Sequence, residues 1–354
     1  MIKELKLIKN IFARKTPRYV VFFVTSKCNV RCKMCFNWKN VINANESENL
    51  TINEIKKIYS EFSDIQQLTI SGGEPFLRSD LPKILEFISH NNDVQSISLP
   101  TNGTLTNLIV SKTEDILKKI KKETHLRIGL SVLGINEIHD KVVMTKGAFN
   151  KLKNTYYKLI ELESKFNNLN IDINICCSYY NKKYMKETID YCREIFNKSS
   201  ITITLARGNL QEKIAKEISP EEYEEIINYL YKNKNNKKMN KPFSKTLAVI
   251  EKISNEQVIN IMKTNKMPSR CYCYSNMIVI QNNGDVFPCE YLDNKLGNLK
   301  NNSVSEILNL KENKKIEKSI IDKKCCCTWE CALMNNIVSN PKKYFNVLKE
   351  YITY

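Results

Sequence analysis

Residues 26–36 read Ser-Lys-Cys-Asn-Val-Arg-Cys-Lys-Met-Cys-Phe and place three cysteines, Cys28, Cys32 and Cys35, on one short stretch. Residues 19–24, directly before them, read Tyr-Val-Val-Phe-Phe-Val, an apolar run of strand length. Three thiols on one loop are soft ligands that suit an iron–sulfur cluster in which one iron stays open. Structural zinc is the alternative, although it uses four ligands, commonly from paired C-x-x-C turns.

Outward from this stretch, strand-like runs alternate with helical ones across residues 18–210. The predicted strands cover residues 18–25, 67–71, 95–99, 126–132, 170–178 and 200–205. Helical patterns lie between them, and Thr51 and Glu54 have the spacing of a capping box at the start of one helix. Six strand–helix units in series predict an α/β fold in which a parallel sheet closes, or partly closes, into a barrel.

The unusual motifs all follow predicted strands. After the three cysteines of the first strand come Gly72-Gly73-Glu74-Pro75, Thr101-Asn102-Gly103, Ser131, residues 179–181 and residues 207–209, in strand order. Because active sites of such barrels lie at the C-terminal ends of the strands, these residues are predicted to share one rim.

The composition is typical of a globular protein of about two domains, with 354 residues, 42% of them hydrophobic and 26% charged. No run approaches the ~18 apolar residues of a membrane span. Charges interrupt residues 1–10, so we expect no secretory signal and a cytoplasmic protein. A net charge of +17 favours anionic partners. An excess of lysine, asparagine and isoleucine is also typical of compositional bias, so we do not expect nucleic acid as the partner.

The combination of C-x-x-x-C-x-x-C after the first strand and Gly-Gly-Glu-Pro after the second resembles the radical S-adenosylmethionine (SAM) enzymes. Over residues 18–210 this resemblance implies a partial (β/α)6, TIM-like barrel with a [4Fe–4S] cluster on Cys28, Cys32 and Cys35. In that family the cluster binds SAM and cleaves it reductively to a 5′-deoxyadenosyl radical, which abstracts a substrate hydrogen. The resemblance implies SAM-site roles, in falling order, for Gly72, Gly73, Glu74, Ser131, Asn181 and Arg207. It identifies no catalytic acid or base.

A second group of cysteines lies near the C-terminus and comprises Cys271, Cys273, Cys289, Cys325, Cys326, Cys327 and Cys331. With a hairpin signal at Asn283-Gly284, this layout resembles the SPASM and twitch extensions of radical SAM enzymes, which carry auxiliary iron–sulfur clusters. Adjacent cysteines in an extended chain point to opposite faces, so we predict one auxiliary [4Fe–4S] cluster rather than two. Its expected ligands are Cys289, Cys327 and Cys331 with Cys271 or Cys273, and Cys325 competes for a place. A closed zinc site is the alternative.

The remaining cysteines, Cys176, Cys177 and Cys192, follow strand and helix patterns and are predicted to be small buried hydrophobes. The expected organisation is a basic N-terminal helix (1–17), the barrel (18–210), a helical and polar linker (211–265), the auxiliary-cluster domain (266–335) and a closing helix (336–354).

These features predict a radical SAM enzyme that oxidises or otherwise modifies a peptide or small molecule, with anionic substrates favoured by the net charge. The expected electron donor is a flavodoxin or ferredoxin. The alternatives are a non-catalytic iron–sulfur or zinc protein that serves as scaffold or electron carrier, and a radical SAM enzyme acting on nucleic acid.

Overall fold

The computed structural model describes residues 16–232 and 244–353. Residues 1–15 of the predicted N-terminal helix therefore lie outside the described residues. The described residues form one nine-stranded sheet with the order β6-β5-β4-β3-β2-β1-β7-β8-β9. The first six strands are parallel and confirm the predicted barrel: β1 Tyr19–Phe23, β2 Gln67–Ser71, β3 Ser96–Thr101, β4 His125–Val132, β5 Leu169–Cys177 and β6 Ser200–Leu205.

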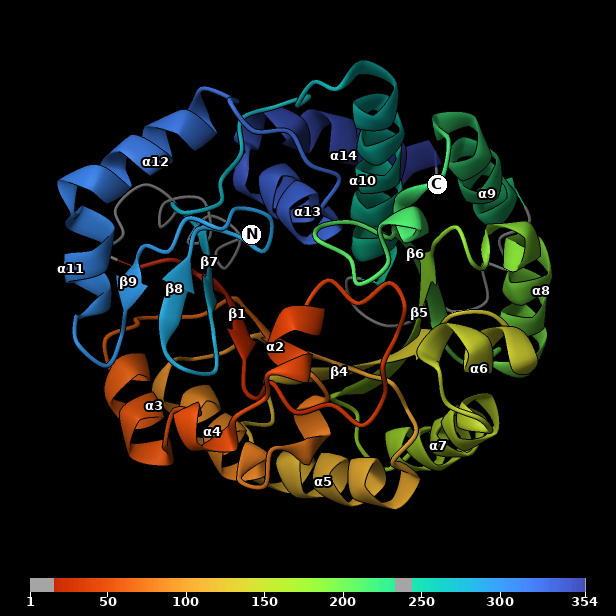
Figure 1. Ribbon diagram of the computed structural model, residues 1–354, viewed down its shortest axis with the longest axis horizontal. Helices are drawn as coiled ribbons and strands as arrows, with labels where there is room; N and C mark the ends of the chain where they lie inside the picture. Colours follow the sequence, from red (N-terminus) through yellow and green to blue (C-terminus); the bar gives the residue numbers. More distant parts are fainter. Residues whose placement is uncertain (1–15, 233–243, 354) are drawn as a thin grey trace.

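Helices surround the sheet in Figure 1. Those of the barrel are α2 Trp38–Ile42, α3 Ile52–Tyr59, α4 Leu81–Asn91, α5 Thr106–Lys119, α6 Glu137–Val143, α7 Ala148–Glu163, α8 Met185–Ile195 and α9 Pro220–Lys232. The predicted capping box begins α3, because the Thr51 hydroxyl accepts from the Glu54 N–H while the Glu54 carboxylate accepts from the Thr51 N–H. No helix in the described part of the chain is long and apolar enough to cross a membrane.

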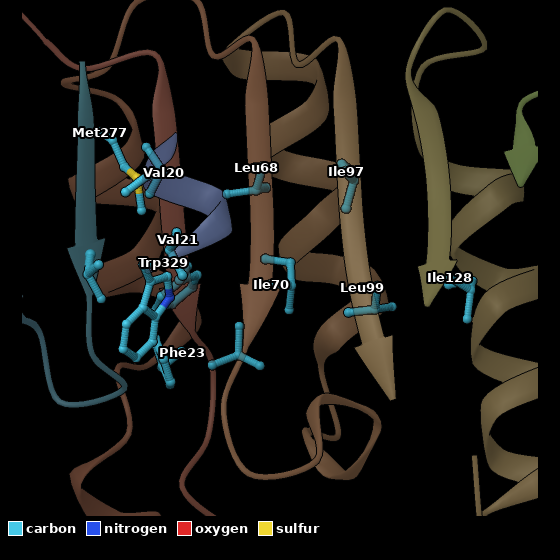
Figure 2. Close-up of a cluster of buried hydrophobic side chains, with 14 of the residues drawn as sticks. Val20, Val21, Phe23, Leu68, Ile70, Ile97, Leu99, Ile128, Met277 and Trp329 are labelled. Atoms are coloured by element: carbon cyan, nitrogen blue, oxygen red, sulfur yellow. The ribbon is translucent and has the colours of Figure 1, made fainter. Parts of the chain in front are cut away.

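The two faces of the barrel sheet differ in polarity. Alternate residues such as Leu68, Ile70, Ile97, Leu99 and Ile128 are buried on one face (Figure 2). Neighbouring positions carry polar groups, and the buried Asp172 of β5 pairs with the Arg127 guanidinium of β4 at 2.8 Å. The barrel therefore packs helices on its apolar face and keeps polar groups on the other.

The C-terminal extension continues the barrel sheet. Its strands are β7 Met277–Ile280, β8 Asp285–Phe287 and β9 Gly297–Asn298, and its helices are α10 Ser244–Thr264, α11 Val304–Asn309, α12 Lys311–Ile321, α13 Glu330–Ser339 and α14 Tyr344–Thr353. The predicted hairpin is present, and β7 also pairs in parallel with β1. This pairing covers the edge of β1, which would otherwise present unpaired backbone groups.

The start of α13 contacts both outer strands of the six-stranded barrel sheet, β1 and β6. The backbone N–H of Leu205 in β6 donates to the Glu330 carboxylate at 2.9 Å, and the Tyr19 hydroxyl of β1 donates to the Cys331 thiol. The preceding Trp329 overlies β1 in Figure 2. Residues 329–331 thus lie where the partial barrel would otherwise be open on one side.

Candidate functional site

The cysteine loop, residues 24–37, connects β1 to α2 and carries Cys28, Cys32 and Cys35. The Cys35 N–H donates to the Cys32 carbonyl at 3.0 Å and turns the chain. Burial, followed by the neighbouring thiols, raises the pKa of Cys32, and burial raises the pKa of Cys35 to about 11. Buried thiols of this kind ionise when a metal centre supplies positive charge, so the donor set fits a thiolate-bound cluster.

Gly72 and Gly73 lie against the backbone of the cysteine loop. A Cβ at Gly72 would lie 2.3 Å from the Thr25 carbonyl oxygen, and one at Gly73 would lie 2.2 Å from that of Lys27. The Gly73 N–H donates to Thr25 and the Glu74 N–H donates to Lys27, both at 2.8 Å. The glycines are therefore required by the close packing of two loops, which fixes the cysteine loop at the rim.

Glu74 joins the rim ends of β2 and β3. Its buried carboxylate accepts from the Thr101 hydroxyl and the Asn102 N–H, each at 2.9 Å, and from the Phe76 N–H at 3.3 Å. The Asn102 amide then donates to the Asn29 side chain on the cysteine loop at 2.9 Å. Burial raises the pKa of Glu74 to about 7. Glu74 thus acts on the site by holding its loops.

The three remaining predicted SAM-site residues differ in what they present. Ser131 is the last residue but one of β4, lies opposite Asn174 of β5 and is partly exposed. Asn181 is fully buried, and its amide accepts from the Ser178 N–H at 2.7 Å and donates to the Cys176 carbonyl at 2.8 Å. Asn181 therefore fixes the turn after β5, whereas Ser131 faces accessible space. Arg207 belongs to a buried cluster described below.

The auxiliary pocket is lined by five cysteines together with Trp329, Glu290 and apolar side chains. Those cysteines are Cys271, Cys273, Cys289, Cys325 and Cys327. The thiols of Cys271, Cys273 and Cys289 interact with one another, which lowers the pKa of Cys271 and Cys289 and raises that of Cys273. The structure thus places around one pocket the predicted ligands Cys289 and Cys327, both alternatives Cys271 and Cys273, and the competing candidate Cys325.

The structure does not bring Cys331 into the auxiliary pocket. Residues 325–329 are extended and α13 begins at Glu330, so Cys327 and Cys331 do not share a helix face despite their C-x-x-x-C spacing. Burial raises the pKa of Cys331 to about 12, and its neighbours are Glu290, Arg207 and Tyr19. Within residues 16–232 and 244–353, no three His, Cys, Asp or Glu side chains converge on a site for a single metal ion.

A largely buried cluster of one cation, two carboxyls and one indole, Arg207, Glu290, Glu330 and Trp329, lies between the barrel and the auxiliary pocket. Arg207 pairs with Glu330 at 2.5 Å and stacks on the Trp329 ring at 4.7 Å. The Trp329 indole N–H donates to Glu290 at 2.7 Å. Burial raises the pKa of both carboxyls, and the Arg207 charge opposes that shift. Sequence reasoning missed the acids, although each sits beside a cysteine of the second group.

An open cavity of about 310 Å³ lies between the cysteine loop and the auxiliary pocket. On the side of β1 and the cysteine loop it is lined by Phe23, Phe36 and Asn37, and on the side of the auxiliary pocket it is lined by Cys289 and Glu290. The hairpin of β7 and β8 completes the wall. The cavity thus adjoins the cysteine loop through Phe36 and Asn37 and the second group of cysteines through Cys289. Its size lies at the lower end of the range for small-molecule sites.

The fold and the two groups of thiols define a class of enzymes that use SAM with iron–sulfur clusters. Residues 22–216 match the model of the radical SAM superfamily, and residues 271–332 match that of the SPASM iron–sulfur cluster-binding domain. The first match covers more than half of the chain, so this protein belongs to the radical SAM superfamily.

Among curated relatives, GTP 3′,8-cyclase of Desulforamulus reducens is 31% identical over 147 residues, which are 41% of this chain and 43% of the relative. AdoMet-dependent heme synthase of Methanosarcina barkeri is 26% identical over 308 residues, 82% of each chain. The chain spans about half the length of the GTP 3′,8-cyclases it matches.

Solved structures share the fold. anSMEcpe with bound AdoMet and Cp18Cys peptide has a TM-score of 0.58 at 17% identity and covers 96% of both chains. Streptococcus suis SuiB bound to precursor peptide SuiA has a TM-score of 0.60 at 16% identity, over 89% of this chain and 70% of SuiB.

Proposed function

We propose that this enzyme cleaves SAM at a [4Fe–4S] cluster held by Cys28, Cys32 and Cys35 and abstracts a hydrogen from a peptide or small molecule. The observation that carries the proposal is the cavity that adjoins both the cysteine loop and the auxiliary pocket. When bound, the cluster and SAM supply the 5′-deoxyadenosyl radical. The electrons come from a donor such as a flavodoxin or ferredoxin in the cytoplasm.

The protein side chains hold the loops, shape the cavity and keep water out. Gly72, Gly73 and Glu74 keep the cysteine loop in place through the backbone contacts described above. Ser131 remains accessible at the rim to hydrogen-bond SAM. Phe23 covers part of the cavity wall and excludes water from the reacting atoms. Asn181 holds the turn after β5, and Arg207 holds the start of α13 through Glu330.

We infer that the auxiliary pocket holds one [4Fe–4S] cluster. Cys271, Cys273, Cys289 and Cys327 are its proposed ligands, because they combine burial with placement around one pocket. Cys325 is less buried and is the alternative fourth ligand. Four thiolates also suit structural zinc, so metal analysis separates the two proposals.

The cavity lining favours a peptide segment as substrate. It presents the carboxamides of Asn37, Asn40, Asn209, Gln281, Asn282 and Asn283. Carboxamides both donate and accept, and so match the N–H and C=O groups of a peptide. The solved relatives anSMEcpe and SuiB, whose fold this chain shares, are recorded with peptides.

Charge in the cavity differs from the charge of the whole chain. The lining holds Asp285, Glu290 and Asp293 with one lysine, Lys39. Lys295 pairs with Asp285 at 2.6 Å and the Arg207 charge acts on Glu290, so the lining is close to neutral and favours a neutral segment over the anionic one that the net charge alone indicates. A second candidate, a small cyclic cofactor precursor, is favoured by the heme synthase that aligns over 82% of this chain.

The test is anaerobic reconstitution with iron and sulfide, followed by metal analysis and assay of 5′-deoxyadenosine after SAM and reductant are added. We expect about eight irons per chain and 5′-deoxyadenosine in the wild type. Cys32→Ala should abolish the product, because two thiolates do not hold the catalytic cluster. Product at the wild-type rate in Cys32→Ala, or zinc in place of iron, would refute the proposal.

A further inference from the structure

We propose that Phe36 and Trp329 form an aromatic bridge that carries one electron between the auxiliary cluster and the SAM-binding cluster. The inference rests on the proposed function, which places an iron–sulfur cluster at each end of the bridge. It assigns a redox role to two side chains that lie between those ends.

The two rings connect the residue after Cys35 with the auxiliary pocket. Phe36 directly follows Cys35, and its ring packs edge-on against Trp329 with centroids 5.1 Å apart at 88°. Trp329 in turn lines the auxiliary pocket with Cys289 and Cys327. Electron tunnelling weakens steeply with distance and is favoured through packed atoms, so two rings in contact are the favoured route across this wall.

Trp329 is fixed on every side that the structure describes. Only 3% of its surface is exposed, and its indole N–H donates to Glu290 at 2.7 Å. The Arg207 guanidinium stacks on the ring at 4.7 Å. A Cβ built on Gly208, whose φ is +85°, would lie 2.9 Å from the ring. Such contacts hold one ring orientation, so the contact between Trp329 and Phe36 is kept.

The second tryptophan of the chain gives a contrast. Trp38 lies three residues after Cys35 at the start of α2 and directly follows the cysteine loop. It therefore serves as a control for replacing a tryptophan near that loop. Its buried indole nitrogen has no hydrogen-bond partner among the described residues, and its ring contacts the Lys39 ammonium at 5.8 Å. Trp38 does not line the auxiliary pocket.

The electron transfer balances without a further reagent. One electron leaves the reduced auxiliary cluster, which becomes oxidised, and enters the oxidised SAM-binding cluster, which becomes reduced. No proton moves, and neither aromatic ring is itself oxidised. In a full turnover the substrate loses one hydrogen atom to 5′-deoxyadenosine and then one proton and one electron, and the bridge returns that electron. The external donor is then needed only to start the cycle.

The test follows the electron directly. Reconstituted holoenzyme is flash-reduced with deazaflavin by one electron equivalent and freeze-quenched, and the two cluster signals are followed by electron paramagnetic resonance. We expect rapid equilibration in the wild type, in W329F, which keeps a ring, and in the matched control W38L. W329L and F36L should lose the rapid phase.

Wild-type equilibration in F36L overturns the proposal even if W329L fails to retain its auxiliary iron. Phe36 is 37% exposed, so F36L should leave the fold intact and remove only the ring contacts with Trp329 and Phe23. Loss of the rapid phase in W38L would equally overturn it, because any tryptophan near the loop would then matter. About four irons per wild-type chain would instead refute the auxiliary cluster on which this proposal rests, whereas absence of 5′-deoxyadenosine would refute the proposed SAM cleavage, so the failures are distinguishable.

Discussion

Gly73→Ala tests whether the glycine loop positions the cysteine loop. The added Cβ would lie 2.2 Å from the Lys27 carbonyl oxygen, 2.5 Å from the Lys27 carbonyl carbon and 2.7 Å from the Ser26 carbonyl oxygen. Contacts below 3.0 Å are essentially unknown for real Cβ atoms, and these neighbours are backbone that cannot rotate away. The loop must therefore shift by about 1 Å, and a displacement of that size can reduce a rate by about 100-fold.

We expect Gly73→Ala to lose SAM cleavage by about that factor. It should also lower the stability of the chain by about 1–3 kcal/mol, the usual cost of an overpacked site. The assays are iron per chain, 5′-deoxyadenosine formation and chemical unfolding.

Gly147→Ala is the matched control for stability. Gly147 has φ +74° and no heavy atom within 4 Å of a built Cβ, so alanine there strains the backbone without touching the cysteine loop. A stability loss of similar size should leave SAM cleavage near the wild-type rate. Wild-type iron content and product formation in Gly73→Ala would refute the positioning role.

Three further predictions follow from other parts of the site. Cys331→Ala should keep the wild-type iron content, because Cys331 faces Tyr19 and Arg207. Cys289→Ala should lose about four irons per chain, because Cys289 lines the auxiliary pocket. The reverse result would show that Cys331 is a cluster ligand. Arg207→Met should cost about 3–5 kcal/mol in chemical unfolding by leaving Glu330 buried without its cation, and adding Glu330→Gln should restore part of it. Burial raises the pKa of the Glu74 carboxyl to about 7, so in the wild type the native state binds the Glu74 proton more tightly than the unfolded chain does. Glu74→Gln removes this carboxyl. Wild-type stability should then fall, by up to about 3 kcal/mol, as the pH rises from about 4.5 to 7, and chemical unfolding of the variant should lack that slope; an unchanged slope would place the titration elsewhere.

Local patterns were enough to predict the barrel. The six strands and the capping box at Thr51 depend on neighbours in the sequence, and the rule that motifs gather at the C-terminal ends of parallel strands then gave the rim. The pairing of β7 with β1 was not predicted, because it joins residues about 260 positions apart by backbone hydrogen bonds that carry no side-chain signature.

The expected role of Cys331 as a cluster ligand came from the resemblance of Cys327-x-x-x-Cys331 to the terminal cysteines of SPASM and twitch extensions. In the structure α13 begins between the two residues, so Cys327 lines the auxiliary pocket while Cys331 faces Tyr19 and Arg207. Trp329 is the N-cap residue of α13 and makes no side-chain capping hydrogen bond, so no capping signal marks the start of that helix in the sequence. Its bond to Glu290 spans 39 positions, so the pattern of residues around it gives no sign of its place in the fold.

The buried ion pair of Arg207 with Glu330 explains why the auxiliary extension and the barrel share one cavity. Glu330 also accepts from the Leu205 N–H, so it satisfies the end of β6 and neutralises the cation that follows that strand. Neither half of the chain could bury its own part of this network alone, since each would keep an unpaired charge. The extension is therefore bound to the barrel by the same residues that hold Trp329 against Phe36, and the spacing between the two groups of cysteines is set by the fold rather than by a flexible linker.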